Sequence, residues 1–324
     1  MQNIITVKDK IQVIEKYFGR GNISGDEKNI SVSCPNCKNN SKNNSSKKKL
    51  AISLTTGVYH CWVCEIKGRN IGIPAKRYLN VSKNEMLEII HTFDIKDKEE
   101  EKEEKVFINL PQDYDLLINN RTRYSSVAKK YLQSRGLSPE DLIKYKIGLS
   151  SQNEFINRVI IPSHDDSLKL NFYLSRTVSD DAFLKYKNCL VKRKDIIFNE
   201  YLLDWDSPLT IVEGVFDSIK VEGNVVPMLG SWIDENYYLF QKIIMNQTPV
   251  ILALDPDAKD KEVKIADSLI EYGVDVYTID QNYEKDFGDM SKDEAKEIIN
   301  NIKKYEKTDR MLYLIQSIKS GSMF

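Results

Sequence analysis

The sequence predicts an α/β protein in which a small β-rich segment precedes an α+β segment and then a parallel sheet with helices on both faces. Three observations support this prediction. Strand-like runs surround two C-x-x-C pairs between residues 30 and 64. A basic region at 111–205 combines helix and strand patterns. From residue 206 onward, short apolar runs alternate with helical patterns, which is typical of a parallel sheet covered by helices.

The chain is long enough for two or three domains, each with a core of its own, because it has 324 residues. Its net charge of -1 hides a strong internal polarity. Residues 1–95 hold 15 Lys and Arg against 8 Asp and Glu, a net +7, and residues 121–195 hold the same numbers. Residues 206–305 hold 10 against 20, a net -10. Basic regions can bind phosphate backbones, whereas an acidic region does so only with cations in between.

We expect a cytoplasmic protein that has no membrane partner. No apolar run approaches the length that spans a bilayer. The N-terminus, MQNIITVKDK, lacks the basic-then-apolar pattern of a secretory signal. In a reducing compartment, paired cysteines favour a metal site over disulfides.

The charged run Asp97–Lys105 contains no apolar residue and predicts a linker. A second low-complexity stretch, Lys38–Lys49, predicts a loop inside the first domain. After the sheet domain, Met311–Ile318 has apolar residues at helical spacing, which indicates a tail that docks on the sheet domain or binds a partner. The expected divisions are an N-terminal domain, a linker, a basic subdomain, a sheet subdomain and a helical tail: 1–95, 96–110, 111–205, 206–305 and 306–324.

The last two subdomains contain clear element signals. Ser138 followed by Pro139 predicts the start of a helix. Ser291, with Glu294 three residues later, predicts another. In the sheet subdomain we expect four strands, Thr210–Val212, Val225–Leu229, Val250–Leu254 and Val274–Ile279, and four helices, Phe216–Val221, Glu235–Met245, Glu262–Tyr272 and Ser291–Ile302.

The two C-x-x-C pairs predict one structural zinc ion. CPNC (Cys34 and Cys37) and CWVC (Cys61 and Cys64) are separated by 23 residues, each within strand-like sequence. Four thiolates from two such pairs form a tetrahedral site, and the pattern is that of a zinc ribbon. Two disulfides or four uncoordinated thiols are the alternative. Tyr59 and Trp62 either stack on bases or pack the ribbon.

Three acidic clusters follow strands of the predicted sheet. Glu213 ends one strand and lies one helical turn before Asp217. Two more clusters follow later strands, with Asp255 and Asp257 in LALDPDA and Asp286 and Asp289 in KDFGDM. Ligands of open parallel sheets bind outside the carboxyl ends of the strands. We therefore expect the three clusters to converge on one edge.

So many carboxylates repel one another unless cations neutralise them. Mg²⁺ and Mn²⁺ suit hard oxygen ligands. Two such ions ~4 Å apart can clamp the attacking and leaving oxygens of a phosphoryl transfer. We expect two or more of these ions, held by Glu213, Asp217, Asp255, Asp257, Asp286 and Asp289.

The acidic clusters resemble a TOPRIM domain, which has a Glu-Gly on its first strand, a D-x-D after a later strand and a third acidic cluster. The region before them resembles the RNA-polymerase domain of bacterial-type primases, and the short segment after them resembles the stand-alone primases of tailed phages. The matching segments are KYLQSRGLSPEDLIKYKIGLS, NRVIIPSHDD, FYLSRTV, LKYKN and IIFNEYLL. With the zinc ribbon, the resemblance covers nearly all of residues 25–305.

This resemblance implies a DNA-dependent RNA polymerase that makes short RNA primers on single-stranded DNA during replication. Its substrates would be NTPs, and a replicative helicase would act in trans. Glu213, Asp255 and Asp257 would be catalytic, with Glu213 either a metal ligand or a proton acceptor. The basic region would contact template, primer or nucleotide through Arg158, Arg176, Lys185, Tyr186, Lys187 and Asn188. A viral protein of this kind would work in the host cytoplasm.

The sequence departs from the family pattern at three points. Leu184 stands where the family often has proline, and four cysteines stand where many relatives include a histidine ligand. The third cluster, D-F-G-D, is one residue longer than usual, so the family pattern supports a role for Asp286 better than a role for Asp289. A TOPRIM nuclease and a non-catalytic recombination mediator with zinc and TOPRIM are the alternative functions. Incorporation of NTPs on single-stranded DNA distinguishes both from a primase.

Overall fold

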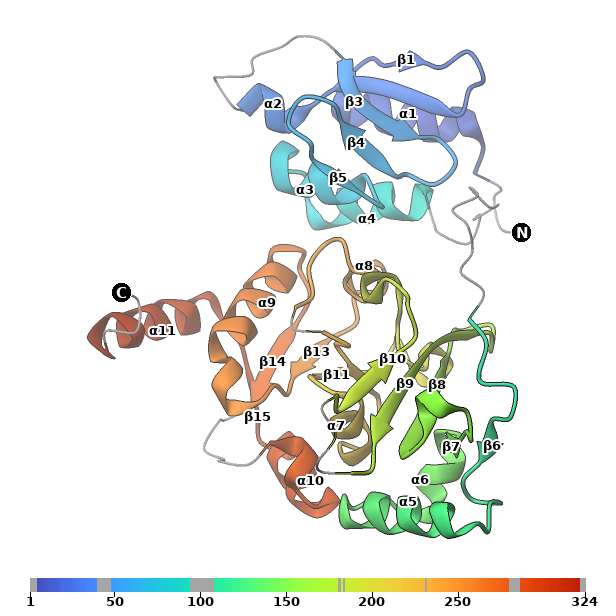
Figure 1. Cartoon of the computed structure of the whole chain (residues 1–324). Helices are drawn as coiled ribbons and strands as arrows, with labels where there is room; N and C mark the ends of the chain where they lie inside the picture. The colour runs from blue at the N-terminus through green and yellow to red at the C-terminus, as the bar shows by residue number, and fades with distance from the viewer. Residues whose placement is uncertain are drawn as a thin grey trace. The chain divides into compact units, whose positions relative to one another are not determined.

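The chain divides into two units, Met1–Lys105 and Val106–Phe324 (Figure 1). This computed structural model describes residues 5–39, 48–93, 108–179, 182, 184–230, 232–279 and 286–320. The charged run Asp97–Lys105 lies outside the described residues, as does most of the stretch Lys38–Lys49.

The smaller unit is built on an antiparallel five-stranded sheet in the order β1-β2-β3-β4-β5. Its strands are β1 (Asn22–Ile23), β2 (Asn29–Ser33), β3 (Lys48–Ser53), β4 (Tyr59–Cys61) and β5 (Lys67–Gly68). Its helices are α1 (Val7–Phe18), α2 (Pro35–Asn39), α3 (Gly72–Leu79) and α4 (Lys83–Thr92).

Alternating burial explains how this small sheet forms its core. Ile30 and Val32 of β2 are fully buried, as are Leu50 and Ile52 of β3, while the residues between them are partly exposed. Such alternation places one face of each strand against the helices. Tyr59 is buried in this core, because Gly68 on the paired strand leaves room for its ring: a Cβ there would lie 2.7 Å from the Tyr59 hydroxyl.

The larger unit begins with an antiparallel sheet in the order β10-β9-β8-β7-β6. Its strands are β6 (Asp115–Leu116), β7 (Gly148–Leu149), β8 (Arg158–His164), β9 (Leu170–Thr177) and β10 (Tyr186–Asn188). Helices α5 (Arg123–Ser134) and α6 (Pro139–Lys144) belong to this part. The predicted helix start is confirmed, since Ser138 caps α6 and Pro139 is its first residue.

A second sheet follows in the order β12-β11-β13-β14-β15. Its strands are β11 (Leu209–Val212), β12 (Val225–Pro227), β13 (Val250–Leu252), β14 (Val276–Ile279) and β15 (Ile302–Lys304). Its helices are α7 (Val215–Lys220), α8 (Tyr238–Asn246), α9 (Lys259–Glu271) and α10 (Lys292–Asn300). The first four strands are parallel, and the register pairs Ile211 with Leu252 and Leu252 with Thr278. The carboxyl ends of β11, β13 and β14 therefore lie level at one edge.

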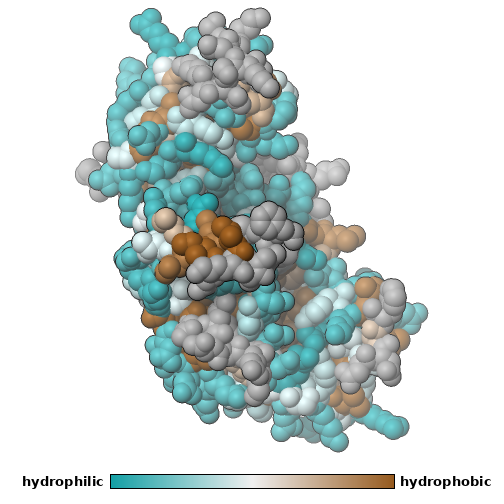
Figure 2. Space-filling model, turned by 90° about the vertical axis from the view of Figure 1, so that its left-hand side faces the viewer, coloured by the Kyte–Doolittle hydropathy of each residue, from teal (hydrophilic) through white to brown (hydrophobic). Residues whose placement is uncertain are grey.

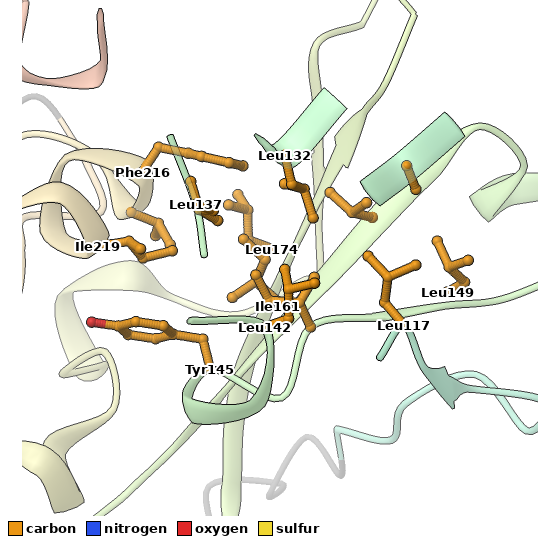
Figure 3. Close-up of a cluster of buried hydrophobic side chains, with 14 of the residues drawn as sticks. Leu117, Leu132, Leu137, Leu142, Tyr145, Leu149, Ile161, Leu174, Phe216 and Ile219 are labelled. Carbon is orange, nitrogen blue, oxygen red and sulfur yellow. The ribbon is translucent and has the colours of Figure 1, made fainter. Parts of the chain in front are cut away.

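One hydrophobic core joins the antiparallel sheet to helix α7, which follows the first strand of the second sheet (Figure 3). Phe216 and Ile219 of α7 pack with Leu132 of α5, Leu142 of α6 and Leu174 of β9. Since α7 begins two residues after Glu213, this core holds the acidic edge of the second sheet against the antiparallel sheet.

The predicted α/β fold is confirmed, with one correction in the sheet subdomain. All four predicted strands and all four predicted helices are present, and Ser291 with Glu294 caps α10 as expected. The last helix, predicted to reach Ile302, ends at Asn300. The chain then returns as β15, which pairs antiparallel with β14 at the edge of the sheet. Lys303 and Lys304 of β15 are exposed, and charged side chains on an edge strand hinder its pairing with a strand of another molecule.

The tail forms a helix, α11 (Lys307–Ser320), that contacts α9 through polar groups. Arg310 lies 3.2 Å from Asp267, and the Tyr313 hydroxyl donates to Asp260. Of the apolar residues at helical spacing, Met311, Ile315 and Ile318 are exposed and Leu314 is half-buried, so these contacts of α11 with α9 are made by polar groups. Figure 2, viewed from the side on which α11 projects in Figure 1, shows hydrophobic surface there. Across the described ranges, no helix combines the length and the hydropathy needed to cross a bilayer.

Candidate metal centres and nucleic-acid interface

The four cysteines of the smaller unit form one compact cluster. Cys34 follows β2, Cys37 lies in α2, Cys61 ends β4, and Cys64 lies in the turn before β5. Their sulfur atoms all lie within 4.8 Å of one another. The Cys34–Cys64 and Cys37–Cys61 separations are 3.6 and 3.7 Å. These distances exceed an S–S bond and match the ~3.8 Å edge of a tetrahedron with zinc–sulfur bonds of ~2.3 Å.

The pKa shifts of Cys34, Cys37 and Cys64 suit a metal that binds thiolates. Burial raises the pKa of Cys34, and it raises the pKa of Cys37 to about 11. Burial also acts on Cys64, but hydrogen bonds from the Ile66 backbone and the Asn36 side chain outweigh it and lower that pKa to about 7. A coordinated thiol is deprotonated outright, so zinc would offset the cost of ionising the buried thiols. The cluster therefore fits one structural zinc ion.

Residues beside the cysteines separate into core and surface. The His60 imidazole lies 3.0 Å from Glu65 and in edge contact with the Trp62 ring, outside the cysteine cluster. Trp62 is 67% exposed, whereas Tyr59 is 7% exposed. Of the two aromatic residues considered for base stacking, only Trp62 is accessible.

In the larger unit, acidic residues gather at the carboxyl edge of the parallel sheet. Glu213 directly follows β11, Asp255 and Asp257 follow β13, and Asp286 precedes the 3₁₀ turn Phe287–Asp289 after β14. Burial raises the pKa of Asp255 to about 7, with further contributions from the charges of Asp217, Glu213, Asp286 and Asp257. All three acidic segments thus follow parallel strands whose carboxyl ends lie at one edge of the sheet.

Asp217 lies between two glycine backbones. The Gly214 N–H donates to its Oδ2 at 2.7 Å, and a Cβ built on Gly214 would lie 2.9 Å from that oxygen. A Cβ on Gly288 would lie 2.9 Å from the other carboxylate oxygen. Burial raises the pKa of Asp217, and the charges of Glu213 and Asp286 act in the same direction. The glycine in the longer D-F-G-D element thus allows the third acidic segment to approach Asp217.

The carboxylates are neighbours but do not converge on one point. Within the described parts of the chain, the cysteines are the one group that brings three or more ligand atoms within 4.8 Å of one another. Mutual repulsion keeps like charges apart when no cation lies between them. Asp289 is directed outward, with its side chain 68% exposed and 3.7 Å from Arg135.

Three basic residues that the sequence patterns did not single out lie beside this acidic edge. Lys261 in α9 lies 2.7 Å from the Glu213 carboxylate. Arg135 follows α5 and approaches Asp289, and buried Lys220 donates to the Met290 carbonyl. Lys261 could have been found by position, because the helix that follows a parallel strand begins above the same edge as the strand-end carboxylates.

The six predicted nucleic-acid residues do not share one face of the antiparallel sheet. Arg176 lies opposite Tyr186 in the register, and Asn188 lies opposite Leu174 of the buried cluster. Side chains alternate along a strand, so Lys187 is on the other face. Arg158 and Lys185 also belong to that other face, since Arg158 pairs with Thr177 and Thr177 binds the Lys185 carbonyl.

The face that carries Arg176 is packed against aromatic rings. The Arg176 guanidinium lies 4.8 Å from the Tyr186 ring and 4.7 Å from the Phe216 ring. Its Nε donates to the Tyr131 hydroxyl at 2.6 Å. Arg176 is only 9% exposed, and its charge offsets part of the rise that burial causes in the pKa of Asp217. Arg176 therefore joins the antiparallel sheet to the acidic edge.

The residues on the opposite face make local contacts. Arg158 donates to the Leu184 carbonyl at 2.7 Å, which holds the segment before β10. Lys187 lies 2.8 Å from Glu154, and both side chains are substantially exposed. Leu184, at the position where relatives often have proline, is exposed.

Comparisons with known proteins identify similarity to bacterial primases. No family model matches the chain. A DNA primase of Aquifex aeolicus (strain VF5) is 25% identical over 307 residues, covering 77% of this chain and 60% of that protein. The chain thus matches about three fifths of the length of this curated relative.

Among solved structures, a DNA primase domain from Pseudomonas aeruginosa aligns with a TM-score of 0.51 at 16% identity, covering 64% of this chain and 80% of that one. The zinc-binding and RNA polymerase domains of the Aquifex aeolicus primase align over 92% of this chain and 84% of that one, at 18% identity and a TM-score of 0.46. The Pseudomonas match shows a shared fold.

Proposed function

We propose that this chain, which is similar in sequence to a bacterial DNA primase and shares the fold of a primase domain, is itself a DNA primase. It would act as a DNA-dependent RNA polymerase that makes short RNA primers on single-stranded DNA. One observation carries the proposal: the three acidic segments meet at the carboxyl edge of the parallel sheet, where Asp255 is influenced by four other carboxylates.

The acidic edge fits hard divalent cations. Carboxylate oxygens are the ligands that Mg²⁺ and Mn²⁺ prefer. Glu213 Oε1 is buried and has no hydrogen-bond partner among the described residues, so a bound cation would satisfy an oxygen that the described residues leave unpaired. We propose Glu213, Asp255 and Asp257 as the catalytic ligands, with Asp217, Asp286 and Asp289 in supporting positions. Two or more ions, when bound, would lower the pKa of the attacking 3′-hydroxyl and neutralise charge on the leaving pyrophosphate.

The protein's own residues have separate tasks in this proposal. The Gly214 N–H orients Asp217, and the strand β11 delivers Glu213 to the edge. Burial and the neighbouring carboxylates raise the pKa of Asp255 to about 7, so without a cation this carboxyl is mostly protonated below neutral pH, and a bound cation would favour its ionised form. Glu213 has one oxygen without a hydrogen-bond partner, so both a ligand role and a proton-accepting role remain consistent with its position.

We propose that nucleic acid lies along the basic sheet, which leads to the acidic edge through Arg176. Tyr186 and Asn188 share the face of Arg176 and would orient the primer end or the nucleotide. Arg158, Lys185 and Lys187 on the other face would contact the phosphate backbone or support the strand β10. The zinc-bearing unit would hold the template, and exposed Trp62 is its candidate for stacking on bases.

Primer synthesis by an Asp255→Asn variant tests the proposal. The wild-type protein should incorporate labelled NTPs into short RNA on single-stranded DNA with Mg²⁺, and the variant should make none. Asp275→Asn is a matched control, because Asp275 precedes β14 at the opposite end of the strand and pairs with Lys304. Wild-type levels of synthesis by Asp255→Asn would refute the assignment.

The same assay distinguishes the other candidate functions. DNA cleavage without NTP incorporation would indicate a nuclease, and DNA binding without either reaction would indicate a recombination mediator. We propose a replicative helicase as a partner in trans, and stimulation of primer synthesis by the helicase is the test. A protein with these substrates would work in the cytoplasm, where template and NTPs are present.

A further inference from the structure

Lys261 occupies a position where a positive charge needs a specific partner. It lies in the first turn of α9, where the helix dipole disfavours a cation. Its Nζ is 2.7 Å from Glu213 Oε2, and the two side chains are 20% and 22% exposed. The pair joins segments 48 residues apart in the chain. Glu213 therefore supplies the charge that makes Lys261 tolerable at this helix start.

The other charged residues of this turn are directed elsewhere. Lys259 pairs with buried Glu262 in the same helix, and Asp260 accepts a hydrogen bond from Tyr313. In the described part of the chain, Lys261 is the lysine that forms an ion pair with a carboxylate of the acidic edge. Its ammonium binds one oxygen of Glu213, and the other oxygen is buried without a hydrogen-bond partner.

We propose that Lys261 is an internal counter-ion that holds Glu213 until a divalent cation and the nucleotide triphosphate bind together. This inference rests on the proposed function of the acidic edge. An ammonium and a divalent cation compete for the same carboxylate, and they repel each other when both are close. The flexible four-carbon stem of lysine lets the ammonium move from Glu213 to a phosphate. A polyphosphate supplies the negative charge that the Lys261 ammonium needs after it has left Glu213.

The consequence is coupling between two ligands. A cation alone must displace Lys261 without giving the ammonium a new partner, so it binds weakly. A cation that arrives with a triphosphate supplies that partner, so the affinity of each ligand is raised by the other. Lys261 would thus be a positioning residue that keeps the acidic edge from filling with metal before a nucleotide is present.

Mn²⁺ binding, followed by electron paramagnetic resonance with the cysteine centre saturated with zinc, tests this inference without any turnover. Lys261→Met keeps the length of the side chain and removes its charge. We expect this variant to bind Mn²⁺ alone about tenfold more tightly than wild type, because the ammonium no longer competes for Glu213. A non-hydrolysable NTP analogue should raise the Mn²⁺ affinity of wild type clearly more than that of the variant. Lys264→Met, an exposed lysine one turn further along α9, should behave as wild type in both measurements.

Two further variants keep the test decisive. Lys261→Arg retains the charge and should bind Mn²⁺ alone as weakly as wild type, which separates charge from a loss of packing. Asp255→Asn should reduce Mn²⁺ binding, which places the bound ion at the acidic edge. Unchanged or weaker Mn²⁺ binding by Lys261→Met would overturn the inference. Absence of primer synthesis by the wild-type protein would overturn the proposed function alone, provided that the Mn²⁺ results are as expected.

Discussion

Asp255 should serve the reaction but lower the free energy of unfolding when it is ionised. The Asp255→Asn variant measures both effects, the first by primer synthesis and the second by unfolding. Burial and four neighbouring carboxylates raise the pKa of this residue from 3.8 to about 7. In the unfolded chain the carboxyl loses its proton near its ordinary pKa. The protonated form therefore contributes stability below about pH 4, and that contribution is lost as the pH rises towards 7.

The size of the effect follows from the same two values. Each pKa unit between the folded and unfolded states corresponds to about 1.4 kcal/mol. Asp255 is only partly buried, so solvent screening reduces the cost of ionising it in the cation-free folded state to about 2 kcal/mol above neutral pH. Since the surrounding carboxylates relax when one charge is removed, we expect Asp255→Asn to raise the free energy of unfolding by about 2 kcal/mol near pH 8.

Urea unfolding without added divalent cations, with zinc retained, is the appropriate measurement. A Trp62→Phe background leaves Trp205 and Trp232 as reporters, and both lie in the larger unit. The gain in stability should shrink as the pH falls from about 8 to about 5, where wild-type Asp255 is protonated. Asp275→Asn should change stability by less than about 0.5 kcal/mol, because its side chain is 58% exposed. A loss of stability in Asp255→Asn near pH 8, or a gain that does not depend on pH, would refute the reasoning.

Three other changes test separate parts of the structure. Cys61→Ser should release the zinc ion and unfold the smaller unit, and unchanged zinc content by elemental analysis would contradict this. Gly288→Ala puts a Cβ 2.9 Å from the Asp217 carboxylate and should weaken Mn²⁺ binding about tenfold. Gly230→Ala is the control, because a Cβ at Gly230 would have no atom within 4 Å. Equal Mn²⁺ binding by the two variants would refute the close approach of Gly288 to Asp217. Arg176→Lys loses the planar contact with two aromatic rings and should lower the free energy of unfolding by about 1–2 kcal/mol in thermal unfolding. No change in that measurement would mean that the packed arginine has no structural role.

Much of the fold could be predicted because its signals are local. The alternation of apolar runs and helical patterns after residue 206 predicted the elements of the parallel sheet in their observed order. Caps such as Ser138 and Ser291 involve residues three positions apart, so they can be recognised in the sequence alone. The strand β15 was missed because three exposed residues carry no periodicity, and only pairing with β14 makes them a strand.

The candidate sites show the same division. The cysteine cluster was predictable in full, because two C-x-x-C pairs define their own ligand set. The acidic edge was predictable in outline, because the ends of parallel strands meet at one edge. The nucleic-acid residues were predicted as one group, yet the register places Arg176 and Lys187 on opposite faces. That separation depends on which strands pair and in what register, and neither follows from the residue types.

By itself, the sequence determined the kinds of ligand, their spacing and the strand ends that carry them, because these depend on neighbours within a few residues. Only the tertiary structure decided which charges compensate one another. It pairs Lys261 with Glu213 across 48 residues, places Gly288 against Asp217, and leaves Met311 and Ile315 of α11 exposed. Such contacts follow from how helices and strands pack, and the energy of a charge depends on the groups that packing brings to it.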